Sequence, residues 1–463
     1  MEEKQTLMTE GPIARQMISF TVPLFIGNLF QQLYNTADAL IVGRMLGNDA
    51  LAAVSATGNL VFLLVSFFVG IFAGAGVAIS RFYGARDSEK LSLSIHTNVA
   101  FGLWISVLLT VIGTCLTPAI LRLMGTPEDI MQLSSDYIRI YFAGSLGLVM
   151  YNCLRGIMQA VGNSRDPLNY LIVSSLINIV LDIVFIAVFK TGVGGAAFAT
   201  VISQFVSVFL CLRKLMITKA EYRLYIRKVS IDKTMLKLII NYGLPSGLQN
   251  SVIALANVVV QSNINAFGTM AVSGCGAYSK IEGFGFLPIT SFVIAITTFV
   301  GQNLGAKEYE RAKKGAAFGL ICAIITAELV GLAIYIAAPQ LIAAFTEEPE
   351  AIAFGVQKAR TCTLFYFLLA ASHSLSAVLR GAGKAVVPMA AMLVFWCVLR
   401  VSILEIAVPI FNSIAVVNWV YPITWTCSTV LLMIYYIRAD WVHAFEKSPY
   451  RDKEKDYADS CCR

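Results

Sequence analysis

Long apolar segments alternate with short polar breaks along almost the whole chain. Most of these segments hold about 20 residues with few charges, the length of helix that crosses a hydrocarbon layer of about 30 Å. Such a segment has to be helical, because lipid offers no partner to unpaired backbone groups. With ends good to about three residues, the pattern predicts twelve spanning helices, at 16–43, 51–79, 93–118, 134–157, 167–189, 194–212, 238–266, 274–303, 317–338, 356–378, 386–409 and 416–437.

The polar connections differ sharply in their basic content. Most of the 35 lysines and arginines lie in the two terminal segments and in the loops after the even-numbered spans. Basic loops stay on the cytoplasmic side of a membrane, so we expect a multi-pass protein of the bacterial inner membrane with both termini in the cytoplasm. The N-terminal segment lacks the short apolar core and cleavage site of a signal peptide, so the first span is expected to be retained.

The composition fits this interpretation. Hydrophobic residues make up 57% of the chain and charged residues only 14%, against about 25% charged in soluble domains. The net charge of +7 follows from the basic loops, so we expect a lipid bilayer and no nucleic acid as partner. Ten cysteines form no CxxC pair or Cys/His cluster, although Cys461 and Cys462 are adjacent, so zinc and disulfide sites are weakly supported.

The chain repeats itself at one offset. Pairs of like residues stand 221 or 222 positions apart, including Pro23 and Pro245, Asn35 and Asn257, Gly84 and Gly305, Arg139 and Arg360, Gly162 and Gly383, and Pro167 and Pro388. Six spans per half place both halves in the membrane with the same orientation, which is a parallel repeat of the kind found in transporters. We expect an all-α membrane protein with a six-helix lobe at 1–212, a cytosolic linker at 213–237, a second lobe at 238–437 and a polar tail at 438–463.

One acid lies inside the first span, where a charge costs about 2.5–3.5 kcal/mol to insert. Asp38 is about six residues from the outer end of that span, and Asn178 and Asp182 share one face of the fifth span. Thr200 in the sixth span falls at a similar depth. The four side chains predict an oxygen-rich site in the outer half of the first lobe.

Two kinds of ion fit such a site. Carboxylate, amide and hydroxyl oxygens suit a hard cation such as Na⁺, and two carboxylates that share a desolvated site also suit a proton. The alternative is that each group only bonds a neighbouring helix, as polar groups in membrane bundles commonly do. We favour the cation site, because two acids and two oxygen donors meet at one depth.

The chain resembles the MATE (multidrug and toxic compound extrusion) transporters over nearly its whole length. The resemblance rests on the two six-span lobes, on Pro23 before "YNTADALIVGRMLG", on "FYGARD" after the second span, and on "LRGIMQAVGNSRDP" matched by "LRGAGKAVVP". It implies that Asp38, Asn178, Asp182 and Thr200 form the coupling-ion site. It also implies that Tyr34, Tyr137 and Asn152 complete the network around that site, and that Pro23 is the bend of the first span.

The second lobe departs from part of this family. The NorM-like branch has acids in spans seven and ten, whereas neither span has one here, so the chain looks closer to the DinF-like branch. The residues suggested for the substrate cavity are Asn35, Gln249, Asn257, Gln261 and Glu282. Gln249, Asn257 and Gln261 could equally hold helices together, and Glu282 could equally form an ion pair with a neighbouring helix. Roles are left open for Lys280, Glu328, His373, Arg400 and Glu405, although we expect Glu328, Arg400 and Glu405 to be paired within the lobe and a buried His373 to be hydrogen-bonded.

The energy source follows from what the sequence lacks. The nearest phosphate-loop candidate, "GAGKA" at 381–385, has neither the required first glycine nor the Ser/Thr after lysine. We therefore expect no ATP use, no cofactor and no enzymatic activity, but an antiporter driven by Na⁺ or H⁺. The resemblance implies export of lipophilic, mostly cationic organic compounds. We expect a monomer, although the sequence leaves the oligomeric state open. The alternatives are a lipid-linked precursor flippase, an exporter of one endogenous metabolite, a membrane-embedded enzyme and an ion channel.

Overall fold

The protein is described here by a computed structural model that covers residues 7–123, 126 and 128–446, without the side chains at 39, 48–49, 51–52, 55–64 and 123. All regular structure in this part of the chain is helical. The first half contains α1 (Ile13–Leu46), α2 (Asn48–Gly84), α3 (Ser88–Leu123), α4 (Glu128–Ala143), α5 (Ser145–Ala160), α6 (Arg165–Ile183), the π-helical turn η1 (Val184–Val188) and α7 (Gly192–Ile217). The expected tail beyond residue 446, with Cys461 and Cys462, lies outside the described residues.

The second half repeats this order after a short connection. It contains the 3₁₀ turn η2 (Ile226–Lys228), α8 (Lys233–Asn265), α9 (Thr269–Gly285), α10 (Leu287–Gly305), α11 (Tyr309–Ala343), α12 (Pro349–Thr363), α13 (Tyr366–Gly381), α14 (Val386–Met392), the π-helical η3 (Leu393–Leu399), α15 (Arg400–Phe411) and α16 (Ile414–Arg438). Pro23 lies inside α1 and Pro245 inside α8, so the first long helix of each half carries its proline in the same place.

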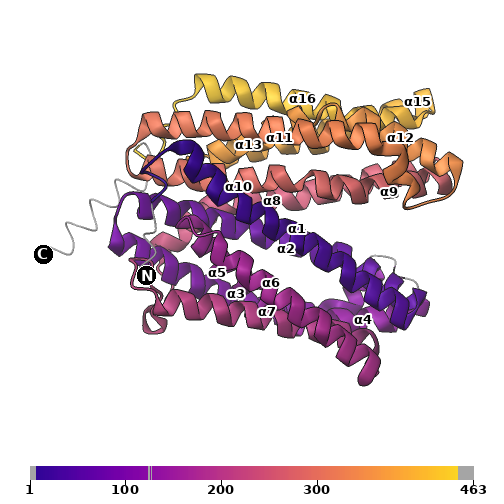
Figure 1. Cartoon of the computed structure of the whole chain (residues 1–463), viewed down its shortest axis with the longest axis horizontal. Coiled ribbons are helices and arrows are strands. Elements are labelled where there is room, and N and C mark those ends of the chain that lie inside the picture. Colours follow the sequence, from indigo (N-terminus) through magenta and orange to yellow (C-terminus); the bar gives the residue numbers. More distant parts are fainter. Residues whose placement is uncertain (1–6, 124–125, 127, 447–463) are drawn as a thin grey trace, which may run out of the picture.

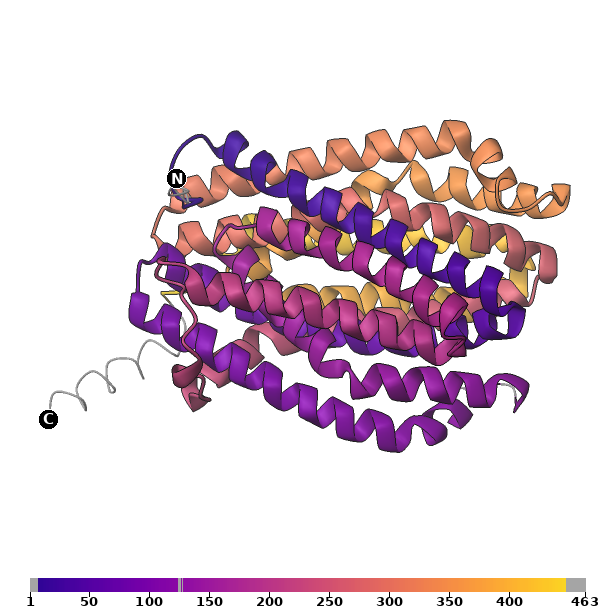
Figure 2. The same cartoon turned by 60° about the horizontal axis from the view of Figure 1, so that its bottom comes forward.

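The two halves form two bundles that lie side by side (Figure 1). The helices of the second half occupy the upper part of the view and those of the first half the lower part, with both chain ends toward the left. The bundles are close together near the chain ends and spread apart toward the opposite end, and a view turned by 60° shows the same long, nearly parallel rods (Figure 2).

The number of spans differs from the twelve that the pattern predicts. Ten helices in the described part of the chain are long and apolar enough to cross a membrane, and the α12–α13 pair, bent by 52°, makes up to eleven. The segment that falls short is 134–157. It is divided into α4 and α5 of 16 residues each, with Gly144 between them, and neither helix alone has the length of about 20 residues that crosses the hydrocarbon layer.

Glycines bring the two lobes into backbone contact near the end that carries the chain termini. A Cβ atom on Gly74 of α2 would overlap the backbone of Gly243 of α8, and a Cβ on Gly84 would overlap that of Gln302 of α10. Helices in a membrane associate closely where small residues let their backbones approach. The lobes are therefore closed against each other at this end.

The chain segment before α1 reinforces this closure. Arg311 of α11 donates hydrogen bonds to the carbonyl oxygens of Met8, Glu10 and Gly11 over 2.7–3.3 Å. The backbone N–H of Met8 donates to Oε1 of Gln302 at 3.0 Å. The start of the first lobe is thus held on the second lobe.

Replacing Arg311 by alanine is expected to release this segment. Each of these charge-assisted bonds contributes on the order of 1 kcal/mol, so tryptic cleavage after the exposed Arg15 should become at least about fivefold faster. Arg86→Ala is the control, because the Arg86–Glu10 ion pair is exposed on both sides and such pairs contribute about 0–1 kcal/mol. Equal cleavage rates in wild type and Arg311→Ala would show that the arginine does not hold the segment.

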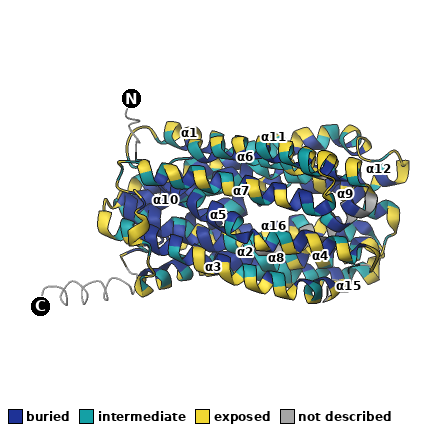
Figure 3. Ribbon diagram, turned by 90° about the horizontal axis from the view of Figure 1, so that it is seen from below, coloured by how far each residue is buried: buried dark blue, intermediate teal, exposed yellow. Residues whose placement is uncertain are grey.

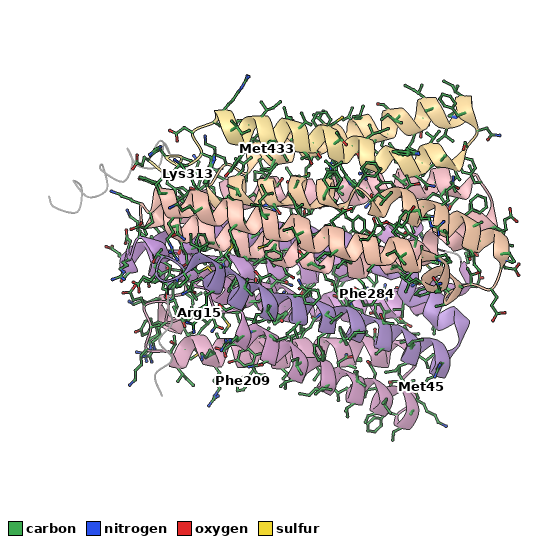
Figure 4. All side chains as sticks on the ribbon, turned by 45° about the horizontal axis from the view of Figure 1, so that its top comes forward. Arg15, Met45, Phe209, Phe284, Lys313 and Met433 are labelled. Atoms are coloured by element: carbon green, nitrogen blue, oxygen red, sulfur yellow. The ribbon has the colours of Figure 1, made fainter. Side chains whose placement is uncertain are left out.

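Buried residues concentrate in the closed part of the molecule, around α5 and α10 (Figure 3). Large apolar side chains cover the outside of both lobes, as for Phe209, which is 64% exposed and points away from the bundle in Figure 4. Arg15 and Lys313 lie toward the end with the termini, while Met45 lies at the other end (Figure 4). An apolar belt between two polar ends is what a bilayer requires of a spanning protein.

Candidate coupling-ion site

Two acids from different helices meet inside the first lobe. Asp38 lies on α1 and Asp182 lies near the end of α6, and their carboxyl groups are in hydrogen-bonding contact. Asp182 is fully buried. Two ionised carboxylates at this separation repel each other, so their contact requires a shared proton or a bound cation.

Both carboxyl groups also have spare capacity to bind. The Oδ1 atoms of Asp38 and of Asp182 are buried and have no hydrogen-bond partner among the described residues. Buried polar atoms are nearly always satisfied, so two orphaned oxygens at one place indicate a position for a ligand that donates a proton or accepts lone pairs. A proton or a hard cation meets that description.

Asn178 and Thr200 hold Asp182 in place. The amide of Asn178, oriented to satisfy its neighbours, donates to Oδ2 of Asp182 at 2.8 Å and accepts from the backbone N–H of Thr200 at 3.1 Å. The spacing of four residues between Asn178 and Asp182 puts both on one face of α6. That face packs on α7, which supplies Thr200.

Tyrosines close the site. Tyr34, one turn before Asp38 on α1, is hydrogen-bonded to the side chain of Thr200, whose hydroxyl donates to the carbonyl of Ala196 at 3.0 Å. Tyr137 of α4 is buried beside the acids and its ring stacks on that of Tyr141 with centroids 6.2 Å apart. Tyr141 was not expected from the sequence, although its spacing of four residues from Tyr137 was visible there.

One expected member of this network has other partners. The amide of Asn152 donates to the carbonyl of Leu148 on its own helix at 2.9 Å. Among the described residues it makes no hydrogen bond to either acid. Its amide is satisfied within α5, so no bound ion is needed to explain a polar side chain at this place in a spanning segment.

The resemblance implies a bend of α1 at Pro23, and the structure shows one continuous helix there. Pro23 cannot donate a backbone hydrogen bond, yet α1 runs through it as one helix. Its ring lies in a small gap lined by Tyr151 and Arg155 of α5 and by Leu171 of α6. The missing hydrogen bond makes this turn the part of α1 where a change in curvature costs least.

The residues suggested for a substrate cavity do not gather in one place. Asn35 is exposed; the amide nitrogen of Gln249 donates to Sδ of Met392 at 2.7 Å; and Gln261 bonds Asn265 one turn away at 2.9 Å. Asn257 and Glu282 instead belong to a group of charged and aromatic residues in the second lobe. Oε1 of Glu282 accepts from the hydroxyl of Tyr278 at 3.4 Å.

The expected ionic pairs of the second lobe are wrong. Oε2 of Glu328 accepts from the backbone N–H of Phe367 at 3.0 Å. The hydrogen-bond partner of this acid is therefore a backbone group next to the break between α12 and α13. Arg400 bonds Asn257 and Thr424, and no ion pair joins it to Glu405 within the described residues. His373 lies edge-on between the rings of Phe286 and Trp396. Contrary to expectation, its Nε2 has no hydrogen-bond partner in this part of the chain.

A comparison with known families decides what kind of protein carries this site. The sequence profile described as MatE matches residues 23–184 and 245–404, one segment in each half of the chain. The chain belongs to the MatE family. As a MatE protein it is a multi-pass membrane transporter of the multidrug efflux type, and it is not an enzyme.

Named relatives of this MatE protein support the assignment. It is 32% identical over 383 residues to the "Probable multidrug resistance protein YoeA" of Bacillus subtilis (strain 168), with 81% of this chain and 82% of that protein covered. It is 29% identical over 392 residues to YpnP of the same strain, a "Probable multidrug resistance protein", with 85% and 88% covered. A solved outward-facing conformation of a multidrug resistance MATE family transporter matches with a TM-score of 0.87 at 25% identity, covering 95% of this chain and 98% of that one.

Proposed function

We propose that this MatE protein is a secondary antiporter that exports lipophilic, mostly cationic organic compounds in exchange for Na⁺ or H⁺. The observation that carries the proposal is the contact between the Asp38 and Asp182 carboxyl groups, each with one unsatisfied buried oxygen. Drug-like substrates are supported by the multidrug resistance names of the two Bacillus relatives. The coupling ion binds between the two acids, with Asn178 and Thr200 positioning Asp182 and with Tyr34 bonded to Thr200.

The proposed topology places both termini in the cytoplasm. The basic end of the molecule carries the termini, and basic segments remain cytoplasmic. The lobes are closed at this end and apart at the other, which makes the state described here outward-facing. We include α4–α5 as the twelfth span, because Gly144 interrupts a segment whose length spans a bilayer. The lack of acids in spans seven and ten favours the DinF-like branch.

The proposed cycle uses the closed end as a gate. In the outward-facing state, ion binding between Asp38 and Asp182 neutralises their repulsion and lets α1 change its curvature near Pro23, and substrate leaves to the outside. The lobes then separate at the cytoplasmic end, where the ion is released and the next substrate binds. The emptied carboxylates repel each other again, which favours return to a loaded state.

Reconstituted protein tests this proposal. Proteoliposomes loaded with a fluorescent lipophilic cation are given an inward Na⁺ gradient or an inward proton gradient, each with and without an ionophore that collapses it. We expect one of the two gradients to drive efflux of the dye and the matching ionophore to stop it. Efflux that proceeds at the same rate with both gradients collapsed contradicts antiport and supports a passive pathway.

Removing the hydroxyl of Thr200 is expected to weaken binding of the coupling ion without abolishing transport. Thr200→Val keeps the side-chain volume but removes the acceptor of the Tyr34 hydrogen bond, a loss of about 1 kcal/mol. The concentration of coupling ion that gives half-maximal efflux should therefore rise about fivefold, with little change in maximal rate. Ser203→Ala on the same helix is the control, because among the described residues the Ser203 hydroxyl donates only to the backbone carbonyl of Thr200, at 2.8 Å. An unchanged ion dependence in Thr200→Val would remove Thr200 from the site.

A further inference from the structure

The second lobe buries two positive charges. Lys358 of α12 is 3% exposed and Arg400, the first residue of α15, is 1% exposed. These helices and α9 lie in the part of the second lobe that faces away from the chain termini (Figure 1). A buried charge is costly unless it is paired and hydrogen-bonded, so the surroundings of these two residues decide what they are for.

Arg400 is only partly satisfied. Its Nη1 donates to Oδ1 of Asn257 at 3.3 Å and its Nη2 donates to Oγ1 of Thr424 at 3.1 Å. Its Nε is buried and has no partner among the described residues. The guanidinium lies 4.6 Å from the ring centre of Tyr421 and 5.2 Å from that of Trp396.

The ammonium group of Lys358 lies beside two aromatic rings. Its Nζ lies 5.3 Å from the ring centre of Tyr421 and 5.7 Å from that of Tyr278. Among the described residues, Glu282 is the acid close to both cations, and it accepts a hydrogen bond from Tyr278. In the part of the chain that the structure describes, no ion pair within 4.0 Å joins Glu282 to either cation. Two cations and one acid leave a net positive charge without a direct counter-ion.

The position of this cluster matches that of the acidic pair in the first lobe. At the repeat offset of 221, Lys358 corresponds to Tyr137 and Tyr421 corresponds to Thr200, while Asn257 corresponds to Asn35 at 222. Tyr137 and Thr200 both border the Asp38–Asp182 pair. The two lobes therefore carry charges of opposite sign at equivalent places.

We propose that Lys358 and Arg400 form a binding site for the carboxylate of an aromatic exported compound. An arginine with a spare Nε–H beside a lysine suits a carboxylate, because the guanidinium donates along two parallel bonds. The ring of Tyr421, which is partly exposed, supplies flat apolar contact for an aromatic body. The proposal rests on the export function above and extends its substrate class to amphiphiles that carry a carboxylate.

A matched pair of dyes tests the site without any gradient. Rhodamine B has a free carboxylate, and its ethyl ester has the same aromatic body without the negative charge. Binding of each dye to the full-length protein in detergent is measured by fluorescence polarisation. We expect wild type to bind rhodamine B at least about tenfold more tightly than the ester, the size of a charge-assisted hydrogen bond.

Four variants test whether Lys358 and Arg400 cause the preference for rhodamine B over its ester. Lys358→Met and Arg400→Gln should each reduce the ratio of the two affinities to near one, whereas Lys358→Arg should preserve it. Lys280→Met is the control, because Lys280 is an exposed lysine on α9 of the same lobe, and its ratio should equal that of wild type. The wild-type comparison needs no variant, so the proposal stays testable if Lys358→Met or Arg400→Gln fails to fold.

The outcomes separate this site from the antiport mechanism. The carboxylate site is overturned if wild type binds rhodamine B no more tightly than the ester. It is also overturned if folded Lys358→Met protein still prefers rhodamine B to the ester. If wild type binds rhodamine B tenfold more tightly than the ester but dye efflux does not depend on either ion gradient, the carboxylate site is supported and antiport is overturned. If an ion gradient drives efflux of the ester but wild type binds rhodamine B no more tightly than the ester, antiport is supported and the carboxylate site is overturned.

Discussion

Asp38→Asn reduces gradient-driven efflux to the leak of protein-free vesicles. The neutral amide keeps the shape of the side chain but cannot take up a proton, and it offers one coordinating oxygen where the carboxylate offers two. The ion then no longer changes the charge of the site, so its gradient cannot bias the two states of the protein. The measurement is initial efflux of a fluorescent lipophilic cation from proteoliposomes under the gradient that drives wild type.

The control separates loss of coupling from loss of structure. Asp136→Asn removes an exposed acid of α4 that accepts from Gln132 one turn away at 3.1 Å, and it should transport like wild type. Asp38→Asn should still bind the dye in detergent, because removing a buried charge relieves a cost of insertion. Wild-type efflux in Asp38→Asn would mean that Asp38 is structural and that coupling lies elsewhere.

Gly74→Ala is expected to weaken closure of the lobes and to slow transport at least about fivefold. The added Cβ would overlap the backbone of Gly243, and a backbone cannot move aside as a flexible side chain can. Closely packed interfaces tolerate an added methyl group at a cost of about 1–3 kcal/mol, which lowers the population of the closed state about fivefold or more. Efflux should fall in proportion, because each cycle passes through this state.

Gly76→Ala is the matched control on the same helix. A Cβ there meets only the Cβ of Ala160 at 4.0 Å, an ordinary contact, and the gain in helix propensity is the same in both variants. Spin labels at the exposed positions Arg213 of α7 and Lys313 of α11, in a background without native cysteines, report the separation of the lobes. The short-distance population should shrink in Gly74→Ala alone; identical distributions in the two variants would contradict the proposed role of this contact.

The sequence predicted the elements of this fold better than their breaks. The apolar run at 16–43 predicted α1 to within three residues at each end, whereas α3, α8 and α11 begin five to eight residues before the expected spans because the helix continues into polar sequence. The breaks at Gly144 and between α12 and α13 were missed because they depend on tertiary contacts. The N–H of Phe367 at the second break, for example, is satisfied by Glu328 from another helix.

The two polar sites differ in how far the sequence could predict them. Depth in a span and a spacing of four residues were enough to group Asp38, Asn178, Asp182 and Thr200, because these rules act within one helix or between helices of known direction. The role of Lys358 was missed, since the rings beside it come from α9 and α16 and no local pattern links them. Only the repeat offset, which aligns Lys358 with Tyr137, pointed to it.

Ion movement driven by substrate tests the central claim most directly. Proteoliposomes loaded with the exported cation, with no ion gradient imposed, are diluted into medium that contains radioactive sodium or into a weakly buffered medium with a pH indicator. The account predicts that outward substrate flow drives Na⁺ or H⁺ inward through wild type but not through Asp38→Asn. Substrate efflux through wild type without inward movement of either ion would contradict antiport through the Asp38–Asp182 site.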